Sequence, residues 1–214
     1  MVPAINWDTY FKGIGVKAID TVIVSEPKYM AAVQEILAEN NVSDWKAYLR
    51  WSAFNGAAGR LSSELEKANW DFYSKDLRGA KAQRPREERA LQTLNWTVGE
   101  ALGKLYVDQK FPPEAKEKAE KMIQNVIKAF ENRIAALPWM SEETKVKAIE
   151  KLRATQVKIA YPDKWKDYSK MEINGVEAGG TYLQNMLNAS AHNFQKDLDK
   201  LGKPVDKSEW FMAP

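Results

Sequence analysis

Hydrophobic residues recur every three or four positions along most of this chain, which is the spacing of one face of an α-helix. The clearest run extends from Ala115 to Leu137, with Glu and Lys on the remaining faces. Comparable runs span residues 5–11, 25–39, 43–56, 60–77, 85–110, 141–154 and 181–201. The pattern predicts a mainly α-helical, multi-helix fold.

Prolines, glycines and capping residues indicate where these helices begin and end. Pro27 and Pro113 suit first-turn positions, where the missing N–H costs nothing. Ser141 precedes two glutamates, which predicts an N-cap with an acidic first turn. Gly56 and Gly59 indicate either a break or a close contact between helices.

One stretch departs from the helical pattern. Val157, Ile159 and Tyr161 alternate with polar or small residues, which predicts a short strand near 157–161. Residues 163–180 follow as a loop containing Lys, Asp and Gly. We therefore expect at most one or two short strands within a single domain over residues 1–214, a length that supports a sizeable core.

Charge and hydropathy exclude several classes of function. The 214 residues include 32 basic and 29 acidic side chains, for a net charge of +3, which describes a mixed surface and not a nucleic-acid footprint. The basic stretch over 78–89 is interrupted by Glu87 and Glu88 and is typical of a solvated loop and first helical turn. No apolar run approaches the ~18–20 residues of a membrane span.

Candidate chemistry is limited by a single histidine and the absence of cysteine. A cysteine nucleophile is impossible, and a zinc site with two His ligands cannot be built. His192 is either a lone base or ligand, or a helix-face residue in a polar contact. The paired carboxylates are adjacent in sequence and favour capping and solvation. We expect no catalytic and no metal-binding residue in this chain.

The final twelve residues, 203–214, have no helical period and yet contain Trp210, Phe211 and Met212. Large apolar patches usually mark interfaces, so we predict that these three residues bind a partner. The alternative is that the segment folds back onto its own helices. If the three side chains are exposed, we also expect self-association.

Six short stretches, in order along the chain, resemble the neprilysin family of zinc metallopeptidases in its bacterial, endopeptidase O-like form. They are Ile5-Asn6-Trp7, Tyr48-Leu49-Arg50-Trp51, Gly103-Lys104-Leu105-Tyr106-Val107, Trp139-Met140-Ser141, Lys158-Ile159-Ala160-Tyr161-Pro162 and Val205-Asp206-Lys207-Ser208-Glu209-Trp210. Ala160 departs from the family, which more usually has Gly at this position.

The resemblance implies a two-lobed fold in which this chain is the largely helical covering lobe. Such a lobe encloses the active-site chamber and restricts it to short peptides. Residues 203–214 would lead toward the absent catalytic lobe, which is the expected partner and carries the zinc and the H-E-x-x-H helix. Family members work outside the cytoplasm, so we expect an exported parent protein whose leader is absent here.

Two other functions stay open at this point. One is a stand-alone helical protein-binding module without peptidase activity. The other is an enzyme in its own right that uses His192 and nearby carboxylates.

Overall fold

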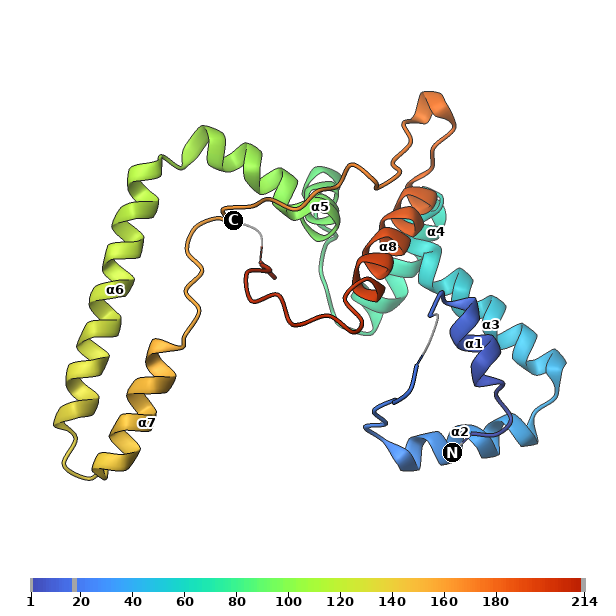
Figure 1. Cartoon of the computed structure of the whole chain (residues 1–214). Coiled ribbons are helices and arrows are strands. Elements are labelled where there is room, and N and C mark those ends of the chain that lie inside the picture. The colour runs from blue at the N-terminus through green and yellow to red at the C-terminus, as the bar shows by residue number, and fades with distance from the viewer. Residues whose placement is uncertain (1, 17–18, 213–214) are drawn as a thin grey trace. The chain divides into compact units, whose positions relative to one another are not determined.

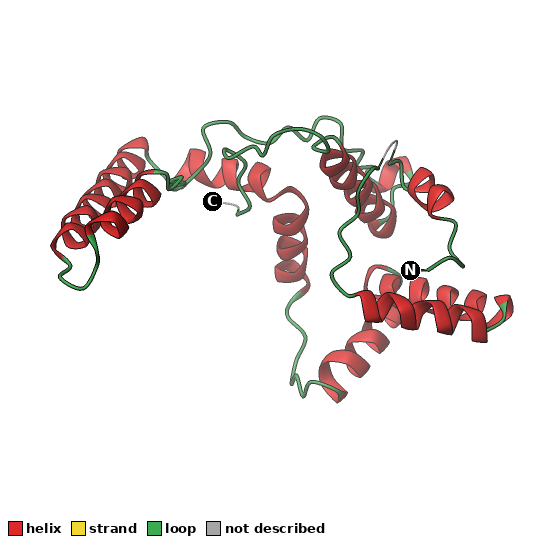
Figure 2. Ribbon diagram, turned by 60° about the horizontal axis from the view of Figure 1, so that its bottom comes forward, coloured by secondary structure: helices red, strands yellow, loops and turns green. Residues whose placement is uncertain are grey.

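The computed structural model describes residues 2–16 and 19–212, and this part of the chain contains eight α-helices and no strand (Figure 1; Figure 2). The predicted mainly helical fold is confirmed. The helices are α1 Trp7–Gly13, α2 Pro27–Glu39, α3 Val42–Ala57, α4 Ser63–Trp70, α5 Arg86–Lys110, α6 Pro113–Ala136, α7 Glu142–Arg153 and α8 Tyr182–Leu198. Shorter turns are η1 Ala58–Arg60, η2 Asp71–Asp76, which is a π-helix, and η3 Val176–Ala178.

Side-chain caps explain most helix starts. An oxygen of the N-cap side chain accepts a hydrogen bond from the main-chain N–H three residues on, which satisfies one of the unpaired donors of the first turn. The capping residues are Asn6, Asn41, Ser62, Ser141 and Thr181. The predicted cap at Ser141 is confirmed, whereas α3 begins one residue before Ser43 because Asn41 caps it.

Gly56 and Gly59, at the end of α3 and in η1, mark a break. The helix ends at Ala57 and continues as η1, and a Cβ added to Gly56 or Gly59 would meet no heavy atom within 4 Å. A close contact of these glycines with any helix among the described residues is therefore excluded. The run predicted over 60–77 is divided into α4 and the π-helix η2.

The prediction of a short strand near 157–161 is wrong, because these residues form an irregular segment without strand hydrogen bonding. Ala160 lies in the left-handed region, with φ of 63°, and the Tyr161 N–H turns back to the carbonyl of Ile159 at 2.8 Å. A left-handed residue cannot continue the extended conformation that the alternating side chains suggested.

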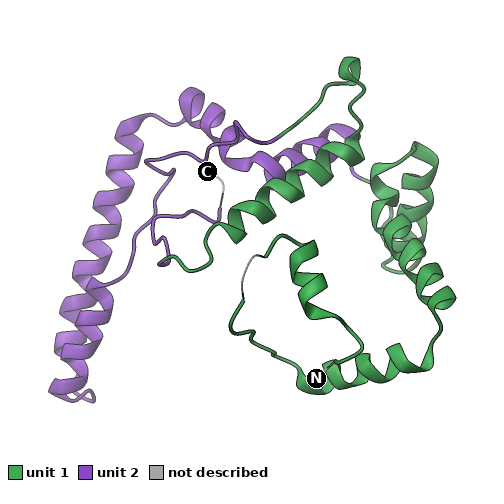
Figure 3. Cartoon of the chain, turned by 45° about the vertical axis from the view of Figure 1, so that its right-hand side comes forward, with its two compact units in different colours: residues 1–83, 172–203 green, residues 84–171, 204–214 purple. Residues whose placement is uncertain are grey.

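The chain divides into two compact units, shown in separate colours in Figure 3. Unit 1 comprises residues 1–83 and 172–203, and unit 2 comprises residues 84–171 and 204–214. The single domain over 1–214 stays a prediction.

In unit 1, asparagines of α8 hold the loop that precedes the helix. Asn185 accepts from the Asn174 N–H at 3.0 Å and donates to the Asn174 carbonyl at 2.9 Å, and Asn188 donates to the Glu172 carbonyl at 3.1 Å. The loop passes so close to itself that a Cβ on Gly180 would lie 2.1 Å from the Asn174 oxygen.

In unit 2, α6 and α7 form an antiparallel pair that is visible in Figures 1 and 2, tied by an ion pair between Arg153 and Glu131 at 2.8 Å. Helix α5 is interrupted at Val98, whose φ of −133° and ψ of 37° are not helical. The residues just after this kink, Gly99, Glu100 and Gly103, are the buried residues of α5.

The hydrophobic core of the described residues is small. Its buried apolar members are Val2, Ala58, Met171 and Ala189, whereas many large apolar side chains are exposed. The accessible surface is 17470 Å². Two separate compact bodies of half this mass would expose only about 12,000 Å² together. The chain therefore leaves far more surface uncovered than compact folding requires.

Candidate partner interface

The segment before Trp210 is shaped by a local turn. Asp206 Oδ1 accepts hydrogen bonds from the N–H and the Oγ of Ser208, at 2.8 and 2.6 Å. The Ser208 hydrogen bonds, aided by the charges of Lys158 and Lys164, hold the pKa of Asp206 below its ordinary value. The turn that Asp206 and Ser208 form lies directly before Glu209 and Trp210.

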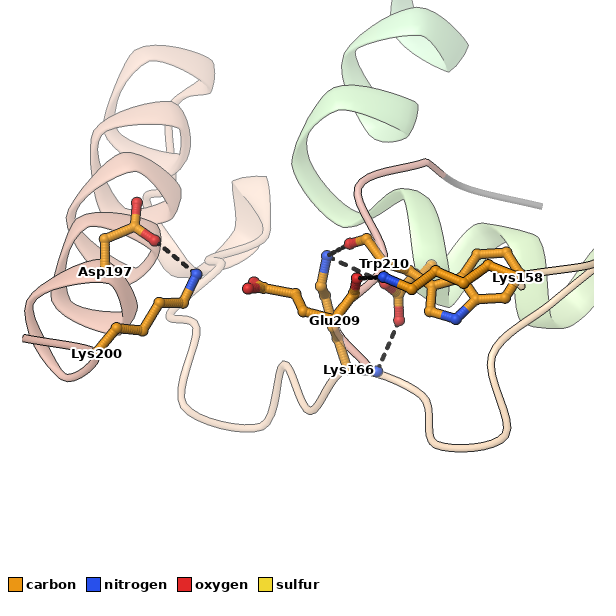
Figure 4. Close-up of polar contacts among 7 residues, drawn as sticks. Lys158, Lys166, Asp197, Lys200, Glu209 and Trp210 are labelled. Carbon is orange, nitrogen blue, oxygen red and sulfur yellow. Dashed lines mark hydrogen bonds and ion pairs between the residues drawn. The ribbon is translucent and has the colours of Figure 1, made fainter. Parts of the chain in front are cut away.

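Two lysines then hold the main chain of this segment, as Figure 4 shows. The Lys158 ammonium donates to the carbonyl of Glu209, and the Lys166 ammonium donates to the carbonyl of Trp210 at 2.8 Å. Both lysines belong to the irregular segment that follows α7. All of these residues lie within unit 2.

A buried carboxylate anchors one of the two lysines. Glu100, only 4% exposed, accepts from the Lys166 N–H at 2.9 Å and pairs with the Lys166 ammonium at 3.1 Å. Burial raises the pKa of Tyr168, and the nearby Glu100 charge raises it further, against a hydrogen bond from the Glu100 main chain that lowers it. The kink at Val98 precedes this anchor by two residues.

The three residues predicted to bind a partner differ in exposure. Trp210 is half-buried, whereas Phe211 and Met212 are 84% and 73% exposed. The Lys158 ammonium lies 5.7 Å from the centre of the Phe211 ring. The main chain of the segment is thus held in place, whereas not all of its apolar side chains are buried. Its role in binding a partner stays a prediction.

A cavity of about 350 Å³ adjoins this segment and is lined by α6, residues 156–164, Ser208 and Trp210. Lys116 donates to Asp163 at 2.7 Å and to the Tyr161 carbonyl at 3.1 Å, and its ammonium lies 4.4 Å from the Tyr161 ring centre. The Tyr161 ring stacks on Trp165. These contacts pin the irregular segment to α6 and leave Lys116 paired.

The single histidine lies on α8 of unit 1. Its Nε2 atom is buried and has no hydrogen-bond partner in the part of the chain that the structure describes, so the polar contact considered for it is absent there at that atom. Across residues 2–16 and 19–212, no three His, Cys, Asp or Glu side chains are grouped so as to hold a metal ion. No helix in the same residues is long and apolar enough to cross a membrane.

Unit 1 contains a second cavity, of about 310 Å³, that sequence reasoning missed. Its wall is mostly apolar, with Trp51, Phe54 and Phe72 among the lining residues. Asn55 donates to the Tyr73 hydroxyl at 2.8 Å within it. The aromatic spacing along α3 was a visible signal, but the π-helix that places Phe72 had none.

The fold and these contacts first place the chain in a structural class. It is an all-helical domain in which two lysines hold the main chain of a segment whose apolar side chains stay exposed. The sequence matches the N-terminal domain model of peptidase family M13 over residues 1–162, and the chain therefore belongs to peptidase family M13. The resemblance to neprilysin-like metallopeptidases is thereby confirmed.

Individual relatives agree with this assignment. The chain is 32% identical over 204 residues to a neutral endopeptidase of Lactobacillus helveticus, covering 95% of this chain and 31% of that protein. It is 28% identical to neprilysin of Mus musculus, covering 92% of this chain and 27% of that protein. The cryo-EM structure of Mycobacterium tuberculosis zinc metalloprotease Zmp1 in its open state matches with a TM-score of 0.85 and 33% identity, over 99% of this chain and 32% of that chain.

The chain spans about a third of the length of these relatives. It corresponds to the N-terminal domain region of neprilysin-like metalloproteases.

Proposed function

We propose that this chain serves as the non-catalytic lobe of a neprilysin-like zinc metalloendopeptidase, where it encloses the active-site chamber and limits it to short peptides. The observation that carries the proposal is the uncovered apolar surface of a helical scaffold, which includes Phe211 and Met212. Its partner is the catalytic lobe of the same peptidase.

The amount of exposed surface supports a large partner. The chain exposes roughly 5,000 Å² more than two compact bodies of half its mass would. Obligate interfaces bury about 2,000–5,000 Å² or more in total over both partners, so this excess is enough for one side of a large interface. Exposed apolar side chains occur in both units, for example Trp51 and Phe72 in unit 1 and Trp139 and Phe211 in unit 2. A partner that covered these faces would supply the core that the chain lacks.

The residues of this chain do not fit the zinc site that the names of its relatives imply. Those names include a putative zinc metalloproteinase of Streptococcus gordonii, 29% identical over 205 residues. A protein zinc site draws on several His, Cys or carboxylate ligands. This chain has one histidine and no cysteine, and among its described residues no three His, Cys, Asp or Glu side chains are grouped so as to hold a metal ion. We assign the zinc to the catalytic lobe.

The contribution of this chain to the reaction would then be physical. A lobe that closes over the substrate excludes bulk water and strengthens electrostatic interactions inside the site. Closure also sets a size limit, because a folded protein cannot enter a closed chamber. No residue of this chain acts on the scissile bond.

The proposal is tested by mixing the chain with the catalytic part of the same peptidase and measuring their association by analytical ultracentrifugation. We expect a one-to-one complex and a loss of the fluorescence of a dye that binds exposed apolar surface. Independent sedimentation of the two parts, with dye binding unchanged, would contradict the proposal.

A further inference from the structure

Two lysines and a buried glutamate grip the main chain of the segment just before the exposed apolar pair. We infer that Lys158, Lys166 and Glu100, here called the lysine clasp, pre-order residues 209–212 so that Phe211 and Met212 are presented to the catalytic lobe. This inference rests on the proposed function and assigns positioning residues to the same interface.

The geometry of the clasp is specific to the main chain. The two ammonium groups donate to the carbonyls of two consecutive residues, Glu209 and Trp210, which lie 51 and 44 positions away in sequence. The contacts therefore fix the path of the backbone without covering the side chains that follow. Phe211 stays 84% exposed even though the Lys158 ammonium lies near its ring.

The buried carboxylate makes the clasp stiff. A surface lysine normally loses much rotamer freedom when it makes one contact, and this entropy loss offsets most of the free energy gained from the contact. Lys166 is different because Glu100, 4% exposed, engages both its ammonium and its own N–H. Lys166 is therefore already ordered when it donates to the Trp210 carbonyl. It connects residues 209–212 to the part of α5 that follows the kink.

Pre-ordering has a consequence for binding. Association costs free energy for every flexible side chain and segment that it immobilises. The free-energy cost of binding is therefore smaller when the segment is already ordered before the partner docks. The presented surface is an apolar pair beside the cation Lys158. The matching surface on the catalytic lobe is an apolar recess with an acidic rim.

The first test measures backbone mobility by ¹⁵N relaxation in the 214-residue chain. For the amides of Trp210 and Phe211 we expect order parameters of about 0.85 in the wild-type chain and below about 0.6 in the Lys158→Met variant. Lys164→Met is the matched control, because Lys164 lies in the same segment but donates to neither carbonyl. Lys158→Arg keeps a cationic donor and should restore the wild-type values. Unchanged order parameters in Lys158→Met overturn the clasp.

Lys166 needs a different design, because Lys166→Met leaves the Glu100 charge buried without its partner. The double variant Glu100→Gln with Lys166→Met removes the charge and its partner together. A dispersed amide spectrum identifies the variant as folded, and we expect raised mobility at Trp210 in it. A folded double variant with a rigid Trp210 overturns the role of Lys166.

The second test measures affinity for the catalytic part of the peptidase. Lys158→Met should weaken association about tenfold, the effect of ordering a few side chains, whereas Lys164→Met should leave it unchanged. Raised mobility with unchanged affinity overturns the presenting role. If the wild-type chain does not associate at all while its mobility responds to Lys158→Met, the clasp stands as a holder of the segment and the proposed partner is wrong.

Discussion

At the scale of single residues, Ala160 carries a strain that its neighbours impose. Its φ of 63° is the left-handed conformation, which costs a residue with a Cβ roughly 1–2 kcal/mol. Lys116 holds the carbonyl of Tyr161 and the side chain of Asp163 on the far side of the turn. These contacts over-determine the path of the chain, so Ala160 must adopt the backbone that glycine would adopt freely.

We therefore expect Ala160→Gly to raise the free energy of unfolding by about 1 kcal/mol, since the strain relieved exceeds the entropy that glycine adds to the unfolded chain. Urea denaturation followed by circular dichroism measures the change. Ala129→Gly, on an exposed face of α6, is the control and should lower stability by about 1 kcal/mol. A lower stability in both variants would show that Ala160 is unstrained.

A second residue-scale prediction concerns Tyr168. Burial is the main cause of its raised pKa and the Glu100 charge is the second, so Glu100→Gln should lower the pKa while leaving it above the ordinary value of 10.0. Because the folded pKa lies above the unfolded one, the stabilising contribution of the neutral phenol is present below about pH 10 and is lost as the pH rises further. An NMR titration of ¹³C-labelled tyrosine measures the shift, and an unchanged pKa in Glu100→Gln would contradict the assigned cause.

At the scale of secondary-structure elements, the helices follow from local sequence and the irregular segments do not. Proline and serine at the predicted boundaries placed α2, α6 and α7 within a few residues, because caps and first-turn prolines act through neighbouring atoms only. The kink at Val98 and the π-helix η2 have no comparable local signal.

The candidate interface was predictable in the same limited sense. An aperiodic segment containing Trp210, Phe211 and Met212 stands out by composition alone. The lysines that hold it lie more than forty positions away, and nothing near Lys158 or Lys166 in sequence indicates that they contact residues 209 and 210. The alternation at 157–161 predicted a strand, and only the left-handed Ala160, set by contacts with α6, explains why none forms.

The cap of α7 provides a test at this scale. The Ser141 hydroxyl accepts from the Thr144 N–H at 3.3 Å and contacts the Thr144 hydroxyl at 2.8 Å. We expect Ser141→Ala to lower the free energy of unfolding by about 1 kcal/mol, the usual value of an N-cap. Ser190→Ala, on the exposed face of α8, should change stability by less than about 0.5 kcal/mol. Equal effects of the two substitutions in chemical denaturation would argue against the cap.

At the scale of the whole chain, the account depends on apolar surface that the chain does not cover itself. Such surface favours self-association when no partner is present. We expect the isolated chain to associate at high concentration, and the double variant Phe211→Ser with Met212→Ser to associate less, as measured by light scattering. Val176→Ser, at an equally exposed position (84%), is the control and should leave association unchanged. Equal association of all three proteins would show that Phe211 and Met212 are not part of the interface.

The central claim is that this lobe encloses a catalytic chamber without supplying chemistry. The most direct measurement co-expresses the chain with the catalytic part of the peptidase and compares cleavage of a short peptide with cleavage of a folded protein. We predict that the chain restores peptide cleavage, does not promote cleavage of the folded protein, and works equally well as His192→Ala. If the catalytic part alone cleaves both substrates equally well and adding the chain changes neither rate, the claim is wrong.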